Sequence, residues 1–386
     1  MQTDFHHKVI TVVLPCLNEE ATVAICIRKA KDAIQKLGLE SEIIVVDNGC
    51  TDRTVQIATD AGARVIVETE KGYGSALRAG IDAAKGQIVV MADADDTYDF
   101  THIDRLVKPI LTGKSEFVIG NRFADIKKGA MPILHRYIGN PILSFILRVM
   151  FKTQVKDVHC GMRAFTKEAY QKLGLVTKGM EFASEMVIRA ALSKLHMEQV
   201  DISYHLRAGE SKLRTFRDGW RHLRLMLLYS PDFLFLLPAA FLWSIGFLII
   251  MILATGPLKI GHRVIDIHTM LAAAVTNIIG LQLGAFGLIA KAHGHFTGLR
   301  IDKFVQKWSG WIRLEYGLLL GFILGGSGFL FLIYVIISWA QRGFGNIFYV
   351  RELILSLVIL SNAMVIVSTS FILSLMAIRH KTINPN

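Results

Sequence analysis

The sequence predicts an α/β domain with a largely parallel sheet, followed by a basic amphipathic segment and four transmembrane helices. Two observations support this prediction. Short β-branched runs alternate with helix-like stretches in the first half of the chain, which is typical of a parallel sheet. Long apolar stretches with few charges fill the second part, as membrane spans require. We place the α/β domain at residues 1-207, the amphipathic segment at 208-231 and the membrane domain at 232-386.

Five short runs in the α/β domain are the candidate strands. They are continuously apolar, as expected of strands that are buried on both faces of a parallel sheet. Helix-like stretches lie between the first four of them, and Asp52, Gly74 and Ser75 lie near the helix starts. The candidate strands are Val9-Leu14, Glu42-Val46, Arg64-Val67, Gln87-Ala92 and Phe117-Ile119, and the candidate helices are Glu19-Leu37, Thr54-Ala61 and Ser75-Ala84.

Four apolar stretches predict the membrane spans, at about 232-254, 268-290, 316-339 and 353-378. At ~1.5 Å per residue, each is long enough to cross a hydrocarbon core of about 30 Å. Their length and low charge disfavour the alternative, which is four buried helices of a soluble domain.

Lysine and arginine residues predict the orientation of these spans. The connection 291-315 and the C-terminal tail are richer in them than the connections 255-266 and 340-352. Because cytoplasmic loops carry an excess of such residues, we expect the α/β domain, the 291-315 loop and the C-terminus to be cytoplasmic. The chain is thus expected to be a multi-pass membrane protein.

The segment from Ser211 to Tyr229 interleaves basic and apolar residues. This pattern is typical of a helix that lies at a membrane surface. A solvated helix that packs on the α/β domain is the alternative. The net charge of +11 also fits contact with anionic lipid, and we expect no nucleic-acid partner.

The strongest local motif is V-V-M-A-D-A-D-D-T-Y-D, in which an apolar strand ends in a group of aspartates. Ligands of open α/β sheets bind beyond the carboxyl ends of the strands. Hard divalent cations prefer oxygen ligands and share them with phosphates, so Asp93 and Asp95 suit Mg²⁺ or Mn²⁺. An acidic loop that faces water is the alternative for this motif taken alone.

Three further motifs precede it in order: L-P-C-L-N-E-E, V-V-D-N-G-C-T-D-R-T and E-K-G-Y-G-S-A-L-R-A-G. With the D-A-D strand, this arrangement resembles family 2 glycosyltransferases over roughly residues 8 to 230. Within that family it is similar to the dolichyl-phosphate mannose and glucose synthase-like group. The resemblance implies a GT-A, Rossmann-like fold that binds a nucleotide-sugar and Mg²⁺ or Mn²⁺.

The resemblance also implies roles for residues at the nucleotide. Leu17 stands where the family usually has an aromatic residue, and Thr97 stands where mannose synthases have glutamine. Asp47 would accept hydrogen bonds from the base, and its alternative role is to cap the helix that starts near Asp52. Asp93 and Asp95 would hold the metal. The implied nucleotide-sugar set is Pro15, Leu17, Glu19, Asp47, Lys71, Gly72, Asp93, Ala94, Asp95 and Arg122.

The later motifs G-N-R, D-V-H-C-G-M-R-A-F, G-M-E-F-A-S-E and G-E-S-K-L-R-T-F-R resemble the family's acceptor side. Pairing of Asp157 with Arg163 is an alternative to a role of Asp157 near the acceptor. Glu181 and Glu185 would bind sugar or serve the structure. Nonspecific contact with lipid headgroups is the alternative for the basic cluster. The implied catalytic residues are Asp95, Arg122, Lys212 and Arg217, and the acceptor-phosphate or sugar candidates are Asp157, Arg163, Glu185, Ser211, Lys212 and Arg214.

The implied reaction is transfer of a sugar, with inversion, from a nucleoside-diphosphate sugar to a polyisoprenyl phosphate such as dolichyl or undecaprenyl phosphate. We favour a UDP-sugar as donor, with GDP-mannose as a further candidate. A processive polysaccharide synthase is an alternative, although the Q-x-x-R-W motif and preceding spans of such enzymes are not found. A noncatalytic membrane scaffold is another. A homo-oligomer is compatible with the number of spans.

Overall fold

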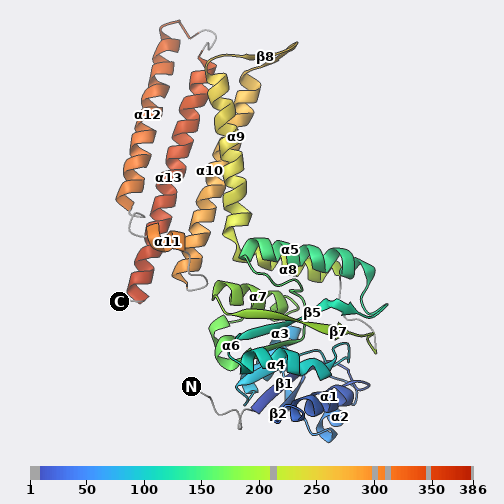
Figure 1. Cartoon of the computed structure of the whole chain (residues 1–386). Coiled ribbons are helices and arrows are strands. Elements are labelled where there is room, and N and C mark those ends of the chain that lie inside the picture. The colour runs from blue at the N-terminus through green and yellow to red at the C-terminus, as the bar shows by residue number, and fades with distance from the viewer. Residues whose placement is uncertain (1–8, 209–214, 298–302, 309–313, 345–348, 384–386) are drawn as a thin grey trace. The chain divides into compact units, whose positions relative to one another are not determined.

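The computed structural model describes residues 9–208, 215–297, 303–308, 314–344 and 349–383, and the chain divides into two compact units, Met1–Tyr229 and Ser230–Asn386. The first is the α/β unit and the second is the membrane unit (Figure 1). The helix of the predicted amphipathic segment belongs to the α/β unit, because it ends at Tyr229.

The α/β unit has, in its described part, a 7-stranded sheet in the order β3-β2-β1-β4-β6-β5-β7. All neighbouring strands are parallel except β6, which runs antiparallel to β4 and β5. The prediction of a mostly parallel α/β sheet is confirmed, and all five predicted strands are present. The strands are β1 (Val9–Cys16), β2 (Glu40–Asp47), β3 (Arg64–Val67), β4 (Ile88–Met91), β5 (Phe117–Ile126), β6 (Arg163–Thr166) and β7 (Met197–Tyr204).

Helices connect these strands and pack on the sheet. Helices α1 and α4 contact each other, and α3 and α7 contact each other. The helices are α1 (Val23–Gln35), α2 (Thr54–Asp60), α3 (Tyr73–Ala83), α4 (Ile103–Leu111), α5 (Asn140–Phe151), α6 (Lys167–Leu173), α7 (Phe182–Leu192) and α8 (Thr215–Tyr229), with short helical turns η1 (Phe100–His102) and η2 (His135–Gly139).

Helices α5 and α8 lie side by side (Figure 1). Both carry exposed apolar side chains. On α5, Ile142, Phe145 and Val149 are exposed, and on α8, Phe216 and Trp220 are exposed. The predicted amphipathic helix is present from Thr215 onward. The matching face of α5 was not predicted from the sequence.

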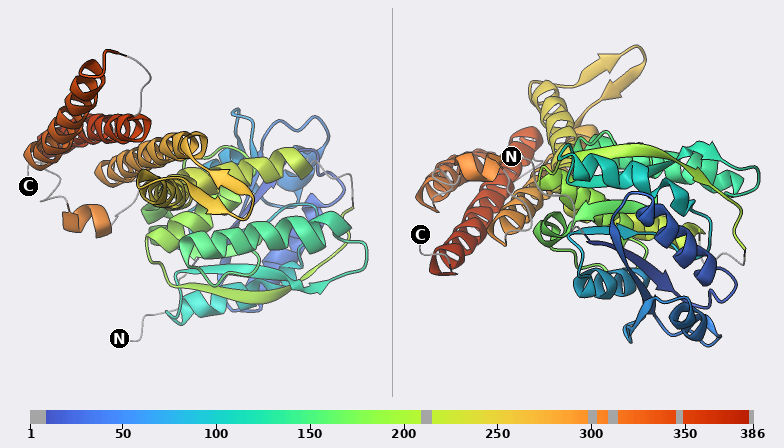
Figure 2. Two further views of the ribbon diagram at one scale, coloured as in Figure 1. Left: turned by 90° about the horizontal axis from the view of Figure 1, so that it is seen from above. Right: turned by 60° about the horizontal axis from the view of Figure 1, so that its bottom comes forward.

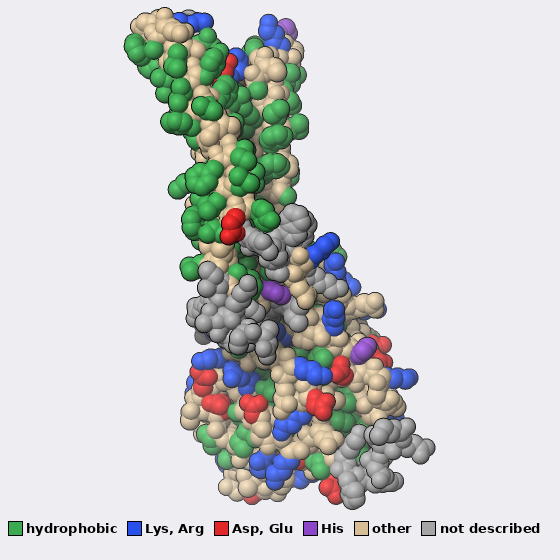
Figure 3. All heavy atoms as spheres, turned by 90° about the vertical axis from the view of Figure 1, so that its left-hand side faces the viewer, with side chains coloured by type: hydrophobic (Ala, Val, Ile, Leu, Met, Phe, Trp, Pro, Cys, Tyr) green, Lys and Arg blue, Asp and Glu red, His purple; other side chains and the backbone are tan. Residues whose placement is uncertain are grey.

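The membrane unit contains, in its described part, four helices that are long and apolar enough to span a membrane: Asp232–Ala254, Ile267–Phe296, Leu314–Ala340 and Val350–Ala377. The four predicted spans are therefore present. On the face drawn in Figure 3, hydrophobic side chains extend along the helices of this unit, with few charged side chains among them. The elements are η3 (Asp232–Leu236), α9 (Leu237–Ala254), β8 (Leu258–Ile260), β9 (Arg263–Ile265), α10 (Ile267–Phe296), α11 (Lys303–Trp308), α12 (Leu314–Ala340) and α13 (Val350–Ile383).

Helix contacts in this unit run from α9 to α10, from α10 to α13 and from α13 to α12, and the end-on view in Figure 2 shows the same sequence of neighbours. Glycines of α12 permit close approach to α13, since a Cβ at Gly321 would lie 2.3 Å from a methyl group of Val367. The amide of Asn277 donates to the Trp243 carbonyl at 3.1 Å and accepts from Asn362 at 3.0 Å, which links three helices.

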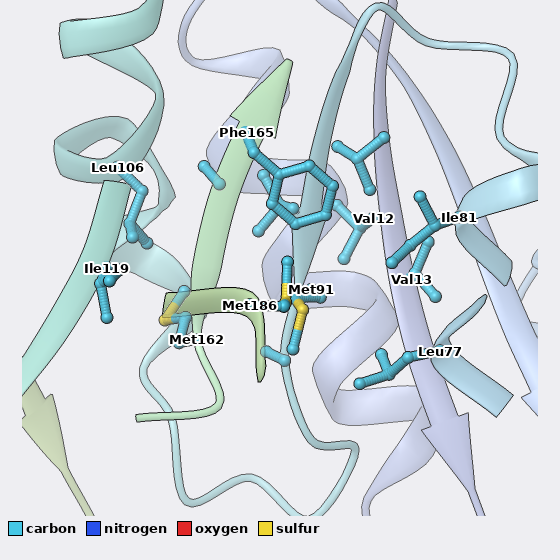
Figure 4. Close-up of a cluster of buried hydrophobic side chains, with 14 of the residues drawn as sticks. Val12, Val13, Leu77, Ile81, Met91, Leu106, Ile119, Met162, Phe165 and Met186 are labelled. Atoms are coloured by element: carbon cyan, nitrogen blue, oxygen red, sulfur yellow. The ribbon is translucent and has the colours of Figure 1, made fainter. Parts of the chain in front are cut away.

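A continuous buried core fixes the strand ends of the α/β unit. Figure 4 shows side chains from α3, α4 and α7 packed against strand residues on either side of the sheet. Because β1 pairs in parallel with β2 and β4, and Cys16 lies opposite Asp47, the segments after β1, β2 and β4 emerge at one edge. The predicted motifs follow these strands, so they meet there. The labelled core residues are Val12, Val13, Leu77, Ile81, Met91, Leu106, Ile119, Met162, Phe165 and Met186.

Candidate active site

The D-A-D motif follows β4 at the carboxyl edge of the sheet. The Ala94 carbonyl accepts a hydrogen bond from Thr22 Oγ1 at 2.6 Å, which ties the motif to the loop before α1. Asp96 has a left-handed backbone with φ of 57° and pairs with Lys29 at 2.7 Å. This turn directs Asp96 toward α1 and leaves Asp93 and Asp95 as the two carboxylates at the strand end.

Asp95 is held by hydrogen bonds from its own turn. Thr97 donates to Asp95 Oδ1 from its backbone nitrogen at 3.1 Å and from its hydroxyl at 2.6 Å. Both side chains are buried, with 4% exposure for Asp95 and 1% for Thr97. The side-chain hydroxyl of Thr97 is thus committed to Asp95, and it orients the carboxylate.

Arg207 approaches the second oxygen of the same carboxylate. Its Nη2 lies 3.3 Å from Asp95 Oδ2 and 3.6 Å from Glu19 Oε1. The arginine follows β7, far along the chain from the acidic residues, and the sequence analysis missed it. Its position shortly before the G-E-S-K motif was the available signal. Arg207 brings positive charge to the edge where a diphosphate would bind.

Asp93 lies in an environment that disfavours its charged form. Burial and the nearby charge of Asp95 raise the pKa of Asp93, while a hydrogen bond from Tyr73 and the charge of Arg207 act in the opposite direction. A divalent cation between the two carboxylates would offset their repulsion.

The donor set fits Mg²⁺ or Mn²⁺ held mainly by substrate. Among the described residues, no group of three or more His, Cys, Asp or Glu side chains is arranged to hold a metal ion. Asp93 and Asp95 would supply two carboxylates, and phosphate and water oxygens would supply the rest, which is the usual way in which proteins hold Mg²⁺.

The loop after β2 forms a compact turn around Asp47. Its Oδ1 accepts from the backbone nitrogens of Gly49 at 2.8 Å and Cys50 at 2.7 Å. Partial burial opposes ionisation, but these hydrogen bonds outweigh it and lower the pKa of Asp47. The expected alternative role, capping the helix near Asp52, is wrong because Asp52 itself accepts from the Thr54 nitrogen at 3.0 Å.

Asn48 organises the same region, and the sequence analysis did not single it out. Its side-chain nitrogen donates to the carbonyls of Glu68 at 2.9 Å and Glu70 at 2.8 Å. Its side-chain oxygen accepts from the Gly72 nitrogen, and its carbonyl accepts from Lys71 Nζ, both at 2.8 Å. One amide therefore joins the loop after β2 to the loop before α3, where the predicted Lys71 and Gly72 lie.

Gly72 satisfies a steric requirement at this loop. Its φ is +146°, and a Cβ there would lie 2.2 Å from the Lys178 carbonyl oxygen. The absence of a side chain at Gly72 thus permits the close approach of the Lys178 backbone.

The first loop brings Pro15, Leu17 and Glu19 to the same edge. Pro15 pairs with Val46 in the sheet, and Leu17 is 41% exposed. The backbone nitrogen of Glu19 donates a hydrogen bond to Thr54 Oγ1 at 2.8 Å, which joins the first two loops. These residues are therefore collected beside Asp47, as the order of the strands requires.

Arg122 and Asp157 form a buried ion pair. Arg122 Nε and Nη2 donate to the two oxygens of Asp157 at 2.7 and 2.8 Å, and the guanidinium lies 5.4 Å from the centre of the Tyr204 ring. The alternative pairing of Asp157 with Arg163 is therefore corrected to a pairing with Arg122. The positive charge of Arg122 still acts on the pKa of Asp93, so it contributes to the field of the site.

Arg163 and Glu185 have structural contacts, which corrects their assignment to the acceptor site. Arg163 is completely buried and donates to the carbonyls of Val158, Cys160 and Ala183. Glu185 is also completely buried and accepts from the backbone nitrogens of residues 176 and 177 and from the Tyr229 hydroxyl. These bonds join loops and helices within the α/β unit and account for the burial of both side chains.

The predicted acceptor residues around the start of α8 are only partly described by the structure. Arg217 lies exposed on α8. Ser211, Lys212 and Arg214 lie outside the described residues.

Histidines form a buried cluster between α7 and α8. Ser184 Oγ lies 2.8 Å from His222 Nδ1 and 3.4 Å from His159 Nε2, and the two rings meet edge to face at 4.6 Å. Burial lowers the pKa of His222 to about 4 and that of His159 well below its usual value. Both imidazoles are therefore neutral at pH 7.

Comparison with known proteins identifies two matching regions. The model of glycosyl transferase family 2 matches residues 11–174, and that of the family 2 C-terminal transmembrane region matches residues 288–377. Low-salt glycan biosynthesis hexosyltransferase Agl6 of Haloferax volcanii is 35% identical over 336 residues, covering 87% of this chain and 81% of that protein. Dolichyl-phosphate hexose transferase of the same organism is 33% identical over 219 residues, covering 56% of this chain and 92% of that protein.

Among solved structures, the chain is similar to glucosyl-3-phosphoglycerate synthase from Mycobacterium tuberculosis in complex with Mn²⁺, UDP and glucosyl-3-phosphoglycerate. The identity is 28%, the TM-score is 0.46, and the match covers 58% of this chain and 80% of that one. The similarity to Agl6 extends through both units and most of both proteins. With its mostly parallel GT-A sheet and the matched transmembrane region, the chain belongs to glycosyltransferase family 2.

Proposed function

We propose that this glycosyltransferase moves a sugar, with inversion, from a nucleoside-diphosphate sugar to a polyisoprenyl phosphate. The observation that carries the proposal is the joint presence of a two-carboxylate site and uncovered apolar helices in one α/β unit. Asp93 and Asp95 suit a cation-bound diphosphate, and the apolar faces of α5 and α8 suit a lipid. The name of the dolichyl-phosphate hexose transferase relative supports the same acceptor class.

The acceptor chemistry requires no strong base. A phosphate monoester has a second pKa of about 6 and is mostly dianionic at neutral pH, so its oxygen attacks the anomeric carbon without losing a proton. The bond from that carbon to the diphosphate oxygen breaks, and the nucleoside diphosphate leaves. This fits the commitment of Glu185 to backbone and Tyr229.

The side chains of the protein then have to place positive charge near the leaving diphosphate and the attacking phosphate. Mg²⁺ or Mn²⁺, when held by Asp93 and Asp95, supplies positive charge for the leaving diphosphate. Arg207 adds a cation at the same carboxylates, and Arg122 contributes from its buried pair with Asp157. Lys212 and Arg217 remain our candidates for the phosphate of the lipid.

The donor is proposed to be a UDP-sugar, with GDP-mannose as a further candidate. Mannose synthases have glutamine at the position of Thr97, and here the Thr97 hydroxyl donates to Asp95. This difference from the mannose-synthase pattern supports the preference for a UDP-sugar. We also propose that the α/β unit and the C-terminus are cytoplasmic, because lysine and arginine are enriched in the 291-315 loop. Self-association remains compatible with the four spans.

The test uses membranes that contain the full chain, a short-chain polyprenyl phosphate, Mg²⁺ or Mn²⁺ and a panel of UDP- and GDP-sugars. Mass spectrometry should detect one lipid-phosphate sugar, which identifies the donor. The Asp95→Ala variant should make none, and its thermal unfolding should match that of the wild type to exclude misfolding. Absence of a lipid product with every donor, from folded protein with metal present, would sink the proposal.

A further inference from the structure

A small β-hairpin connects the first two spans of the membrane unit. Strands β8 and β9 pair antiparallel, with Leu258 opposite Ile265 and Ile260 opposite Arg263. The turn consists of Gly261 and His262, and Gly261 has a φ of +60°, as a hairpin turn with glycine in the first position requires. The hairpin is thus a defined element, not an irregular loop.

The hairpin is attached closely to the membrane helices. It starts four residues after the end of α9 at Ala254 and ends two residues before the start of α10 at Ile267. An ion pair between Asp266 and Arg351 ties its base to the start of α13. These short connections keep the hairpin at the depth where the spans end.

Its direction follows the expected plane of the membrane surface. Figure 1 shows β8 running sideways from the ends of α9 and α10, across their axes, and the right-hand view of Figure 2 shows the hairpin projecting clear of the four helices. Three-residue strands extend roughly 10 Å at ~3.3 Å per residue. An element of this size that runs sideways stays within the headgroup layer, which is about 5–8 Å thick on each side of the hydrocarbon.

The side chains of the hairpin suit that layer better than water. Leu258, Ile260 and Val264 are 39%, 58% and 61% exposed. An isolated two-stranded hairpin is marginally stable in water, and one with uncovered apolar side chains on both faces needs a covering surface. Lys259 and Arg263 lie beside these residues and provide charge that complements anionic headgroups.

We propose that the hairpin Leu258–Ile265 is an interfacial anchor that lies in the phospholipid headgroup layer and prefers anionic lipid. It lies at the membrane face opposite to the start of the first span at Asp232, because one span separates the two. The apolar side chains insert among the upper acyl segments, while Lys259 and Arg263 extend to lipid phosphates. The anchor fixes the ends of α9 and α10 at that surface.

The test measures the depth of residue 260 in the full chain. Ile260→Cys carries a spin label in a Cys50→Ser background, since the other cysteines are buried. Collisions with oxygen and with a water-soluble nickel chelate are compared in nanodiscs of phosphatidylcholine, with and without phosphatidylglycerol. Matched labels are placed at Lys36, which is exposed on the α/β unit, and at Phe329, which is exposed on α12.

The anchor predicts that the label at 260 collides with the nickel chelate several-fold less than the label at 36, and with oxygen less than the label at 329. Phosphatidylglycerol should deepen the label, and the double change Lys259→Gln and Arg263→Gln should abolish that lipid dependence. Nickel access equal to that at 36 would overturn the proposal, because the hairpin would then stand in water. Shielding from both reagents, in detergent as well as in nanodiscs, would also overturn it and indicate a protein partner.

Discussion

Replacing Thr97 by valine should weaken binding of the divalent cation without changing the shape of the site. The Thr97 hydroxyl lies 2.6 Å from Asp95 Oδ1, and the threonine is only 1% exposed, so valine fills the same space and removes the hydroxyl that donates to Asp95. A hydrogen bond to a charged group contributes about 1.5–3 kcal/mol. At about 1.4 kcal/mol per tenfold, the full loss corresponds to a weakening of roughly 10–100-fold, as is typical for residues that orient a metal ligand.

The assay is a Mn²⁺ titration followed by electron paramagnetic resonance, with purified full-length protein and UDP or GDP present. It reports cation affinity independently of turnover. The matched control is Thr97→Ser, which keeps the hydroxyl and should retain most of the affinity. If the valine variant binds Mn²⁺ as tightly as the wild type, or if serine fails as badly as valine, then Thr97 does not orient Asp95 and the reasoning is refuted.

Three further predictions concern the α/β unit. Asp157→Asn leaves the Arg122 guanidinium buried without its charged partner and should lower the free energy of unfolding by about 3–5 kcal/mol, seen as a lower thermal midpoint; an unchanged midpoint would contradict the buried pair. Gly72→Ala places a Cβ 2.2 Å from the Lys178 carbonyl and should weaken nucleotide binding in calorimetry, whereas full affinity would show that the loop yields freely. The pKa of His222 is lowered to about 4 in the folded state, so this histidine binds a proton at higher pH in the unfolded chain than in the folded one. The free energy of unfolding should therefore fall as pH drops from about 6.5 toward 4, by at most about 3 kcal/mol. Denaturant midpoints measured across that range should fall less steeply for His222→Gln, and an equal slope would contradict the burial.

The sequence was sufficient to locate the site because its key residues follow buried parallel strands. Asp47 follows β2 and Asp93 follows β4, and parallel pairing brings both ends to one edge. The membrane spans were equally predictable from the sequence, since their length and apolar character are local properties. Strands β6 and β7 were missed because R-A-F-T is short and M-E-Q-V-D-I-S-Y mixes charged and apolar residues.

Partner choice among charged residues required the structure. Arg122 and Arg163 are both near Asp157 in the fold, but only Arg122 directs its guanidinium to that carboxylate. Arg207 reaches Asp95 across 112 positions of chain (207 − 95), and although the nearby G-E-S-K motif marked its region, the sequence alone did not show which carboxylate it contacts. The exposed face of α5 was missed because its apolar residues resemble those of a core helix, and only their exposure distinguishes the two.

The most direct test of the proposed transfer compares matched acceptors with purified full-length protein. Nucleoside diphosphate release and lipid-linked sugar would be measured together for a short-chain polyprenyl phosphate, the corresponding polyprenol and a water-soluble alkyl phosphate. The account predicts that polyprenyl phosphate yields both products in equal amounts and that polyprenol, which lacks the nucleophilic dianion, yields neither. Equal turnover with polyprenol, or sugar transfer only to a glycan primer, would contradict the account.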